Sequence, residues 1–203
     1  MSAFQSYEGL GRLLEYPSAG LLGMAMGCAT ALEATVPDAA TSVRQFAGAA
    51  GQLDQNQREE AYAQIFDLNP ARCLDLGYQI FGETYKRGAF LVKMKQTVLA
   101  HQVDCGAELW DHLPVVLKLL PRLRADEDAA ALVGEVVLPA VEKILRTFED
   151  DPFGYRSLLE AIKTTLMVDF GITHVEPPRS AELAESEGRG RRLPMFPGFH
   201  PPS

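Results

Sequence analysis

The chain has 203 residues, enough for one domain, and 47% of them are hydrophobic. This composition is typical of a globular protein and excludes wholesale disorder. The three cysteines are an odd number without a C-x-x-C pair, which fits a reducing compartment better than a secreted disulfide framework. No apolar run reaches the ~18 residues of a membrane span, and the N-terminus lacks a signal-peptide pattern. We therefore expect a soluble, cytoplasmic protein without stable membrane insertion.

The formal net charge of −8 narrows the choice of partners. Nucleic acid is normally bound by a basic face, and this acidic chain has no Lys/Arg-rich run, so we expect no nucleic-acid partner. A basic peptide or protein is attracted to such a chain. The alternative is that the acidity serves solubility alone.

Helical patterns dominate the sequence. Leu and Ala supply 51 residues but Val and Ile only 18, which favours helices over strands. Apolar residues recur at helical spacing, most clearly over 126–149 and 153–170. These patterns predict an all-α, single-domain bundle of roughly seven to nine helices. The predicted helices cover residues 7–16, 19–34, 38–50, 55–66, 85–103, 111–123, 126–149 and 153–170.

Two of these helices begin with a recognisable signal. Asp54 and Gln57 form a capping-box pattern at the start of the helix over 55–66. Asp111 is the expected N-cap of the helix over 111–123, with Pro114 in its first turn.

The C-terminal residues 176–203 have a different composition. They hold six of the thirteen prolines, and this predicts a flexible tail beyond an all-helical domain of residues 1–175. The tail carries four acidic and four Arg residues, so the net charge belongs to the helical domain.

Motifs of enzymatic chemistry are missing. The chain has no G-x-S-x-G, H-E-x-x-H, G-x-G-x-x-G or P-loop, and its four histidines are scattered without zinc-ligand spacing. We therefore expect no metal site, no bound cofactor and no enzyme activity. The alternative is a small all-α enzyme or ligand-binding protein that uses Asp111 and His112 as an acid–base pair. Adjacent helical residues point about 100° apart, which disfavours that pair.

Two clusters combine aromatic and charged residues where predicted helices begin or end. Aromatic side chains supply contact area and carboxylates hold Arg or Lys, so these clusters predict a peptide-docking groove. The alternative is ordinary helix capping and core packing. The candidate peptide-binding residues are Tyr62, Phe66, Asp67, Arg87, Glu108, Trp110, Asp111, His112 and Pro114.

Four short segments stand out by their order and spacing along the chain. They are Leu13-Leu14-Glu15-Tyr16-Pro17; Tyr62, Phe66 and Asp67; Gly82, Arg87 and Gly88; and Glu108, Leu109, Asp111, His112, Leu113 and Pro114. In this order they resemble the NarJ/DmsD/TorD family of molybdoenzyme maturation chaperones, also called redox enzyme maturation proteins or the nitrate reductase delta-subunit family. The similarity spans residues 7–170, and Trp110 stands where the family usually has proline.

The resemblance implies a cytoplasmic, all-α chaperone without turnover of its own. Its partner is the apo catalytic subunit of a molybdenum oxidoreductase related to nitrate reductase, bound through a basic N-terminal segment that is a twin-arginine leader in exported relatives. The chaperone assists cofactor insertion and assembly before export or membrane docking, as a monomer or homodimer. A further hypothesis is that the tail, which contains Gly190-Arg191-Arg192-Leu193-Pro194, occupies the groove as a placeholder.

Overall fold

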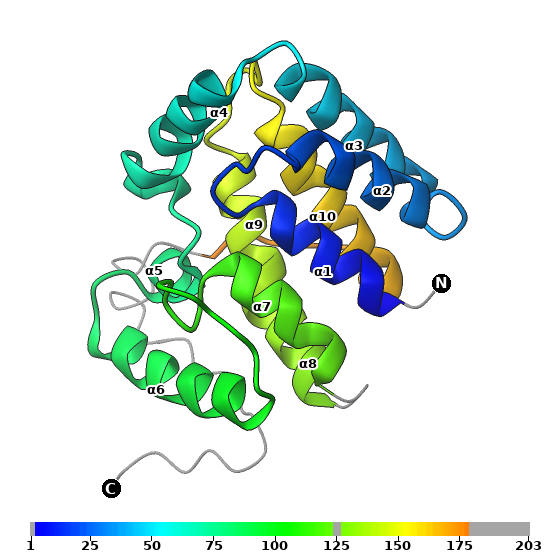
Figure 1. Cartoon of the computed structure of the whole chain (residues 1–203). Coiled ribbons are helices and arrows are strands. Elements are labelled where there is room, and N and C mark those ends of the chain that lie inside the picture. Colours follow the sequence, from blue (N-terminus) through cyan, green and yellow to red (C-terminus); the bar gives the residue numbers. More distant parts are fainter. Residues whose placement is uncertain (1–2, 124–126, 179–203) are drawn as a thin grey trace, which may run out of the picture.

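The computed structural model describes residues 3–123 and 127–178, and this part of the chain is all-α (Figure 1), as predicted. Counting the continuous run α8–η4–α9 as one helix, the described residues form nine helices and no strand. The α-helices are α1 (Ala3–Leu13), α2 (Leu21–Leu32), α3 (Pro37–Ala50), α4 (Gln55–Tyr62), α5 (Leu76–Phe81), α6 (Tyr85–Ala100), α7 (Leu113–Leu119), α8 (Glu127–Leu132), α9 (Leu138–Leu145) and α10 (Tyr155–Asp169). Two short π-helical segments, η1 (Ala63–Asp67) and η4 (Val133–Val137), continue α4 and α8. Two single turns of 3-10 helix are η2 (Pro70–Arg72) and η3 (Leu120–Arg122).

The start of two helices tests the capping predictions. The Asp54 carboxylate accepts a hydrogen bond from the Gln57 backbone N–H, and the Gln57 side chain bonds back to Asp54, so the capping box is confirmed. Pro114 lies in the first turn of α7, also as predicted. The expectation that Asp111 caps this helix is wrong. The N-cap is His112, without a side-chain bond, because the Asp111 carboxylate is used by the N–H of Gly77 in α5 instead.

The core is built around α10. This helix packs along α3 and also contacts α9, while α1 packs on α2 and α7 (Figure 1). Gly154 precedes α10 with φ +82°, and a Cβ there would lie 2.8 Å from the Cα of Phe46 in α3. Glycine is therefore required both for the left-handed backbone and for the close approach of the two helices. The Phe46 and Tyr155 rings pack beside this point at 5.3 Å.

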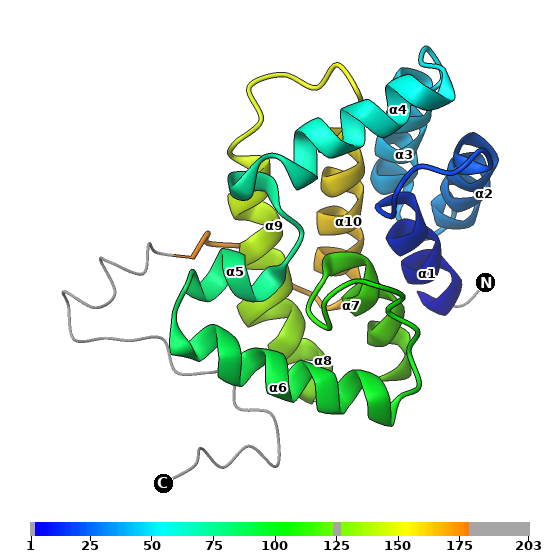
Figure 2. The same ribbon diagram turned by 60° about the vertical axis from the view of Figure 1, so that its left-hand side comes forward.

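Helices α5 and α6 form an outlying pair at one side of the bundle (Figure 2). The inner face of α6 packs through Phe90, whose ring lies 5.5 Å from that of Phe81 in α5. An isolated antiparallel bridge, Asp75 with His112, joins the start of α5 to the segment before α7. This bridge brings together two segments that are far apart in the sequence, and the candidate site is built around it.

One helix was missed by the sequence prediction, and most of the predicted tail lies outside the described residues. Helix α5 was not predicted, because six residues are too few for helical periodicity to be read. The proposed tail lies outside the described residues except for 176–178. Within the part of the chain that is described, no helix combines the length and the apolar character needed to cross a membrane.

Candidate functional site

A cluster of tyrosine and phenylalanine rings lies where α4 and η1 meet the segment after α1. Tyr62 is buried, and its hydroxyl donates a hydrogen bond to the Leu14 carbonyl at 3.1 Å. The Tyr62 ring lies 5.6 Å from that of Tyr16 and 5.1 Å from that of Phe66. Phe66 in turn meets Tyr155 edge-on. The cluster therefore runs from the buried core to Tyr16, which is exposed.

Carboxylates from three segments surround this ring cluster. Burial raises the pKa of Tyr62, and the negative charges of Asp67, Glu108 and Glu15 raise it further. The Tyr16 hydroxyl also donates to Glu59 at 3.4 Å. We call this region the acidic–aromatic surface, defined by Glu15, Tyr16, Glu59, Asp67 and Glu108 and supported from below by the buried Tyr62.

Exposed apolar side chains lie directly beside these carboxylates in the sequence. Leu68 follows Asp67 and is among the most exposed large apolar residues in the described part of the chain. Leu109 follows Glu108 and is also exposed. Together with Tyr16 they place apolar contact area next to negative charge, the combination that suits a basic and partly apolar ligand.

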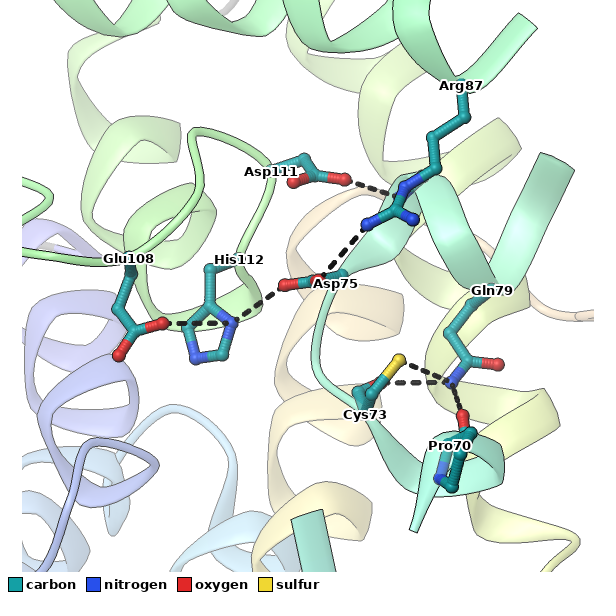
Figure 3. Close-up of polar contacts among 9 residues, drawn as sticks. Pro70, Cys73, Asp75, Gln79, Arg87, Glu108, Asp111 and His112 are labelled. Atoms are coloured by element: carbon teal, nitrogen blue, oxygen red, sulfur yellow. Dashed lines mark hydrogen bonds and ion pairs between the residues drawn. The ribbon is translucent and has the colours of Figure 1, made fainter. Parts of the chain in front are cut away.

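A chain of polar contacts continues from Glu108 toward α6 (Figure 3). His112 Nδ1 lies 3.9 Å from Glu108 Oε2 and 3.2 Å from Asp75 Oδ1. The other oxygen of Asp75 accepts from the Arg87 guanidinium at 3.3 Å. Arg87 also lies over the Tyr78 ring at 5.4 Å. The order Glu108, His112, Asp75, Arg87 thus links the acidic–aromatic surface to α5 and α6.

Asp111, which precedes His112 in the sequence, is fully buried. Its Oδ2 accepts the Gly77 backbone N–H at 2.8 Å, and its Oδ1 has no hydrogen-bond partner among the described residues. Burial raises the pKa of the Asp111 carboxyl. The Gly77 hydrogen bond and the positive charge of Arg87 act in the opposite direction and compensate only in part. Asp111 therefore holds α5 in place rather than facing solvent.

The nine candidate residues predicted from the sequence differ in how far their side chains are exposed to solvent. Asp67 and Glu108 are exposed, and Arg87 and His112 are partly exposed. Trp110 is partly buried, and its ring lies 5.8 Å from Lys95 Nζ on α6, away from the ring cluster. The buried members are Tyr62, Phe66, Asp111 and Pro114. For these buried residues the contacts match the alternative of core packing, and in this conformation they support the surface without forming it.

Sequence reasoning missed Asp75, whose carboxylate contacts both His112 and Arg87. The signal available was an Asp directly before the apolar run Leu76–Phe81, the position of a helix N-cap. It also left Glu15 and Tyr16 out of the candidate residues, although both lie in a segment that carries the family resemblance. Tyr16 is the aromatic residue of the acidic–aromatic surface that faces solvent.

A cavity of about 480 Å³ adjoins the acidic–aromatic surface on the side of α1 and α7. Its wall includes Glu15 and Tyr16, together with Arg12, Lys118 and Arg122. Its charges are balanced: Lys118 pairs with Glu15 at 2.7 Å, and Arg122 donates to backbone carbonyls. None of the nine candidate residues lines this cavity.

The described residues do not form the pair of Asp111 and His112 that the sequence suggested. The side chains of Asp111 and His112 diverge: one bonds to Gly77 and the other faces Asp75. Among the described residues, no group of three or more His, Cys, Asp or Glu is placed to hold a metal ion. The exposed carboxylates and apolar side chains of the region suit the binding of a basic, partly apolar ligand.

No protein-family model matches the chain, and no curated protein sequence matches it.

Proposed function

We propose that this protein is a chaperone for the apo catalytic subunit of a molybdenum oxidoreductase and that it holds a basic, partly apolar N-terminal segment of that subunit on the acidic–aromatic surface. One observation supports the proposal above others. Segments that resemble the molybdoenzyme maturation chaperones are distant in the sequence, yet they supply neighbouring groups of one surface. Glu15, Asp67 and Glu108 come from three of these segments, and the negative charge of each raises the pKa of the Tyr62 hydroxyl.

The chemistry of the surface agrees with such a client. Charge-assisted hydrogen bonds from Arg to carboxylates are about twice as strong as neutral ones and fix orientation. Tyr16, Leu68 and Leu109 supply exposed apolar area for the side chains between the basic residues. Holding this segment keeps the subunit available for cofactor insertion before export or membrane docking.

Calorimetry with the full-length protein tests the proposal. The ligands are synthetic N-terminal segments of catalytic subunits of molybdenum oxidoreductases related to nitrate reductase, and an apo-subunit of this class. We expect binding that weakens with salt, and about tenfold lower affinity in Asp67→Asn or Glu108→Gln. Asp38→Asn is the matched control, since it removes one exposed carboxylate from α3. The absence of binding to every segment and to the apo-subunit at modest salt would contradict the proposal.

A further inference from the structure

Helix α6 has a charge opposite to that of the protein that carries it. The helix contains four basic residues and no acidic residue, whereas the chain as a whole has a formal net charge of −8. It lies at the periphery of the bundle and packs on α5 (Figure 2). Its inner face is fully occupied, because the side chains of Phe90, Met94 and Val98 are buried.

The outer face of α6 carries an apolar seam. Tyr85, Val92 and Leu99 follow one another at intervals of seven residues and are 82%, 59% and 56% exposed. At 100° per residue, three residues at this spacing drift by only about 20° per step, so they form one line along the helix. The small residues Gly88 and Ala89 lie between the first two, and the exposed polar side chain of Gln96 lies between Val92 and Leu99, all close to the same line. We call this line the α6 seam.

Basic side chains border the α6 seam on both sides. Helical geometry places Lys86 and Lys93 along one edge and Lys95 along the other. Lys95 is held at its edge, since its Nζ lies 5.8 Å from the Trp110 ring. Apolar residues every seventh position with flanking charges of one sign are the features by which one helix recognises another of opposite charge.

We propose that the α6 seam is a docking site for an acidic amphipathic helix of a partner protein, separate from the acidic–aromatic surface. The partner presents apolar residues at heptad spacing to Tyr85, Val92 and Leu99 and carboxylates to the flanking lysines. The site does not depend on the proposed function, because its charge preference is the reverse of that of the acidic–aromatic surface.

Two other occupants fit the observations less well. A membrane-surface helix presents an apolar face more than about 100° wide, whereas the three large residues of the α6 seam lie within about 40°. A second copy that pairs α6 with α6 brings together two helices that carry basic and no acidic residues, which is unfavourable. An acidic helix satisfies both the narrow seam and the charge.

The test uses the full-length protein and a synthetic helical peptide of about 21 residues, with Leu at every seventh position, Ala between and Glu on both flanks. A second peptide replaces each Glu with Lys. Fluorescence anisotropy should show salt-sensitive binding of the Glu peptide and at least about tenfold weaker binding of the Lys peptide. Hydrogen exchange should show protection by the Glu peptide within residues 85–100. No binding of the Glu peptide, or equal binding of both, overturns the proposal.

Substitutions separate the α6 seam from general surface effects. Val92→Glu should weaken binding of the Glu peptide at least about tenfold. Val168→Glu on α10 is the matched control, because Val168 is 56% exposed, and it should change the affinity less than about twofold. Circular dichroism confirms that both variants fold. Asp67→Asn should leave binding of the Glu peptide unchanged. Binding at the α6 seam is therefore tested separately from binding of a basic client at the acidic–aromatic surface.

The competing occupants are resolved by the same variants. If the chain co-sediments with phosphatidylglycerol vesicles in a Val92-dependent manner and does not bind the Glu peptide, the seam is a membrane contact and the proposal is wrong. If light scattering shows a dimer that Val92→Glu converts to a monomer, the seam is an interface between copies, and the proposal is equally wrong.

Discussion

His112 Nδ1 lies 3.2 Å from the Oδ1 of Asp75, a residue 37 positions earlier in the chain, and their backbones also form an antiparallel bridge. The second Asp75 oxygen accepts from Arg87. One carboxylate therefore fastens the start of α5, the start of α6 and the segment before α7. Since the last of these segments carries Glu108, the position of Glu108 on the acidic–aromatic surface depends on Asp75.

Removing Asp75 should destabilise the protein more than removing an ordinary surface acid. Asp75→Ala removes the ion-pair partner of Arg87 and leaves His112 with Glu108 alone at 3.9 Å. Arg87 and His112 are both mostly buried, so we expect a loss of about 1–3 kcal/mol. Glu33→Ala is the control, because Glu33 forms an exposed ion pair with Arg44 and should cost less than about 1 kcal/mol. Urea unfolding measures both, and equal losses would contradict a special role for Asp75.

Gly77 in α5 packs too closely against its neighbours to accept a larger residue without movement. A Cβ at this position would lie 2.7 Å from Asp111 Oδ2 and 3.0 Å from Phe90 Cδ1, contacts that force a buried carboxylate or a core ring to move. Although Ala is the better helix former by about 1 kcal/mol, we expect Gly77→Ala to destabilise by about 1–3 kcal/mol.

Gly27 supplies the matched substitution. It is exposed within α2, and a Cβ there meets nothing within 4 Å. Gly27→Ala should therefore stabilise by about 0.5–1 kcal/mol. Thermal unfolding of the two variants should shift in opposite directions, and a shift of the same sign would show that packing at Gly77 is not the deciding effect.

The bundle could be predicted from the sequence because each long helix is indicated by the residue pattern within its own segment. Periodicity places a helix over 153–170, and a cap pattern marks the start of α4 at Asp54. Such signals require only a few neighbouring residues. Helix α5 has six residues, too few for helical periodicity, so Asp75 at its N-cap position is a weak signal on its own, and the helix is held by distant groups such as Asp111.

The candidate site was only partly predictable for the same reason. Residue type and spacing identify Asp67 and Glu108 as carboxylates beside aromatics, and both are exposed. Burial depends on which elements meet, and the sequence could not show that Tyr62 and Asp111 lie inside. The reversed charge of α6 could be read from the sequence, but the exposure of its outer face required the packing of Phe90 against α5.

The buried carboxyl of Asp111 should give a distinctive pH dependence. Burial raises its pKa in the folded state, so the folded protein binds this proton more tightly than the unfolded chain, whose carboxyl titrates near ~3.9. The stability that Asp111 contributes is therefore fully present below about pH 3.9 and is lost as the pH rises through the raised pKa.

The difference in unfolding free energy between wild type and Asp111→Asn isolates this effect, because all other titrating groups are shared. We expect the difference, as wild type minus variant, to fall as the pH rises above about 4. Urea unfolding at a series of pH values measures it. A difference that is flat or rises with pH would show that the Gly77 bond and Arg87 outweigh burial.

Two tyrosines of the ring cluster should separate binding from stability. Tyr16 is 58% exposed and should contact the client segment directly, so Tyr16→Ala should weaken binding about tenfold. Its loss should cost little stability, because the Tyr16 ring lies largely in solvent and its hydroxyl bond to Glu59 is exposed.

Tyr62 should behave in the opposite way. Tyr62→Phe keeps the buried ring but leaves the Leu14 carbonyl without its donor, at a cost of about 1 kcal/mol in unfolding free energy. The client affinity should stay within about twofold of the wild-type value, because only 6% of Tyr62 is exposed. Calorimetry and urea unfolding of both variants complete the comparison. If Tyr62→Phe weakens binding as much as Tyr16→Ala does, the client reaches the buried ring, and the cluster must open when the client binds.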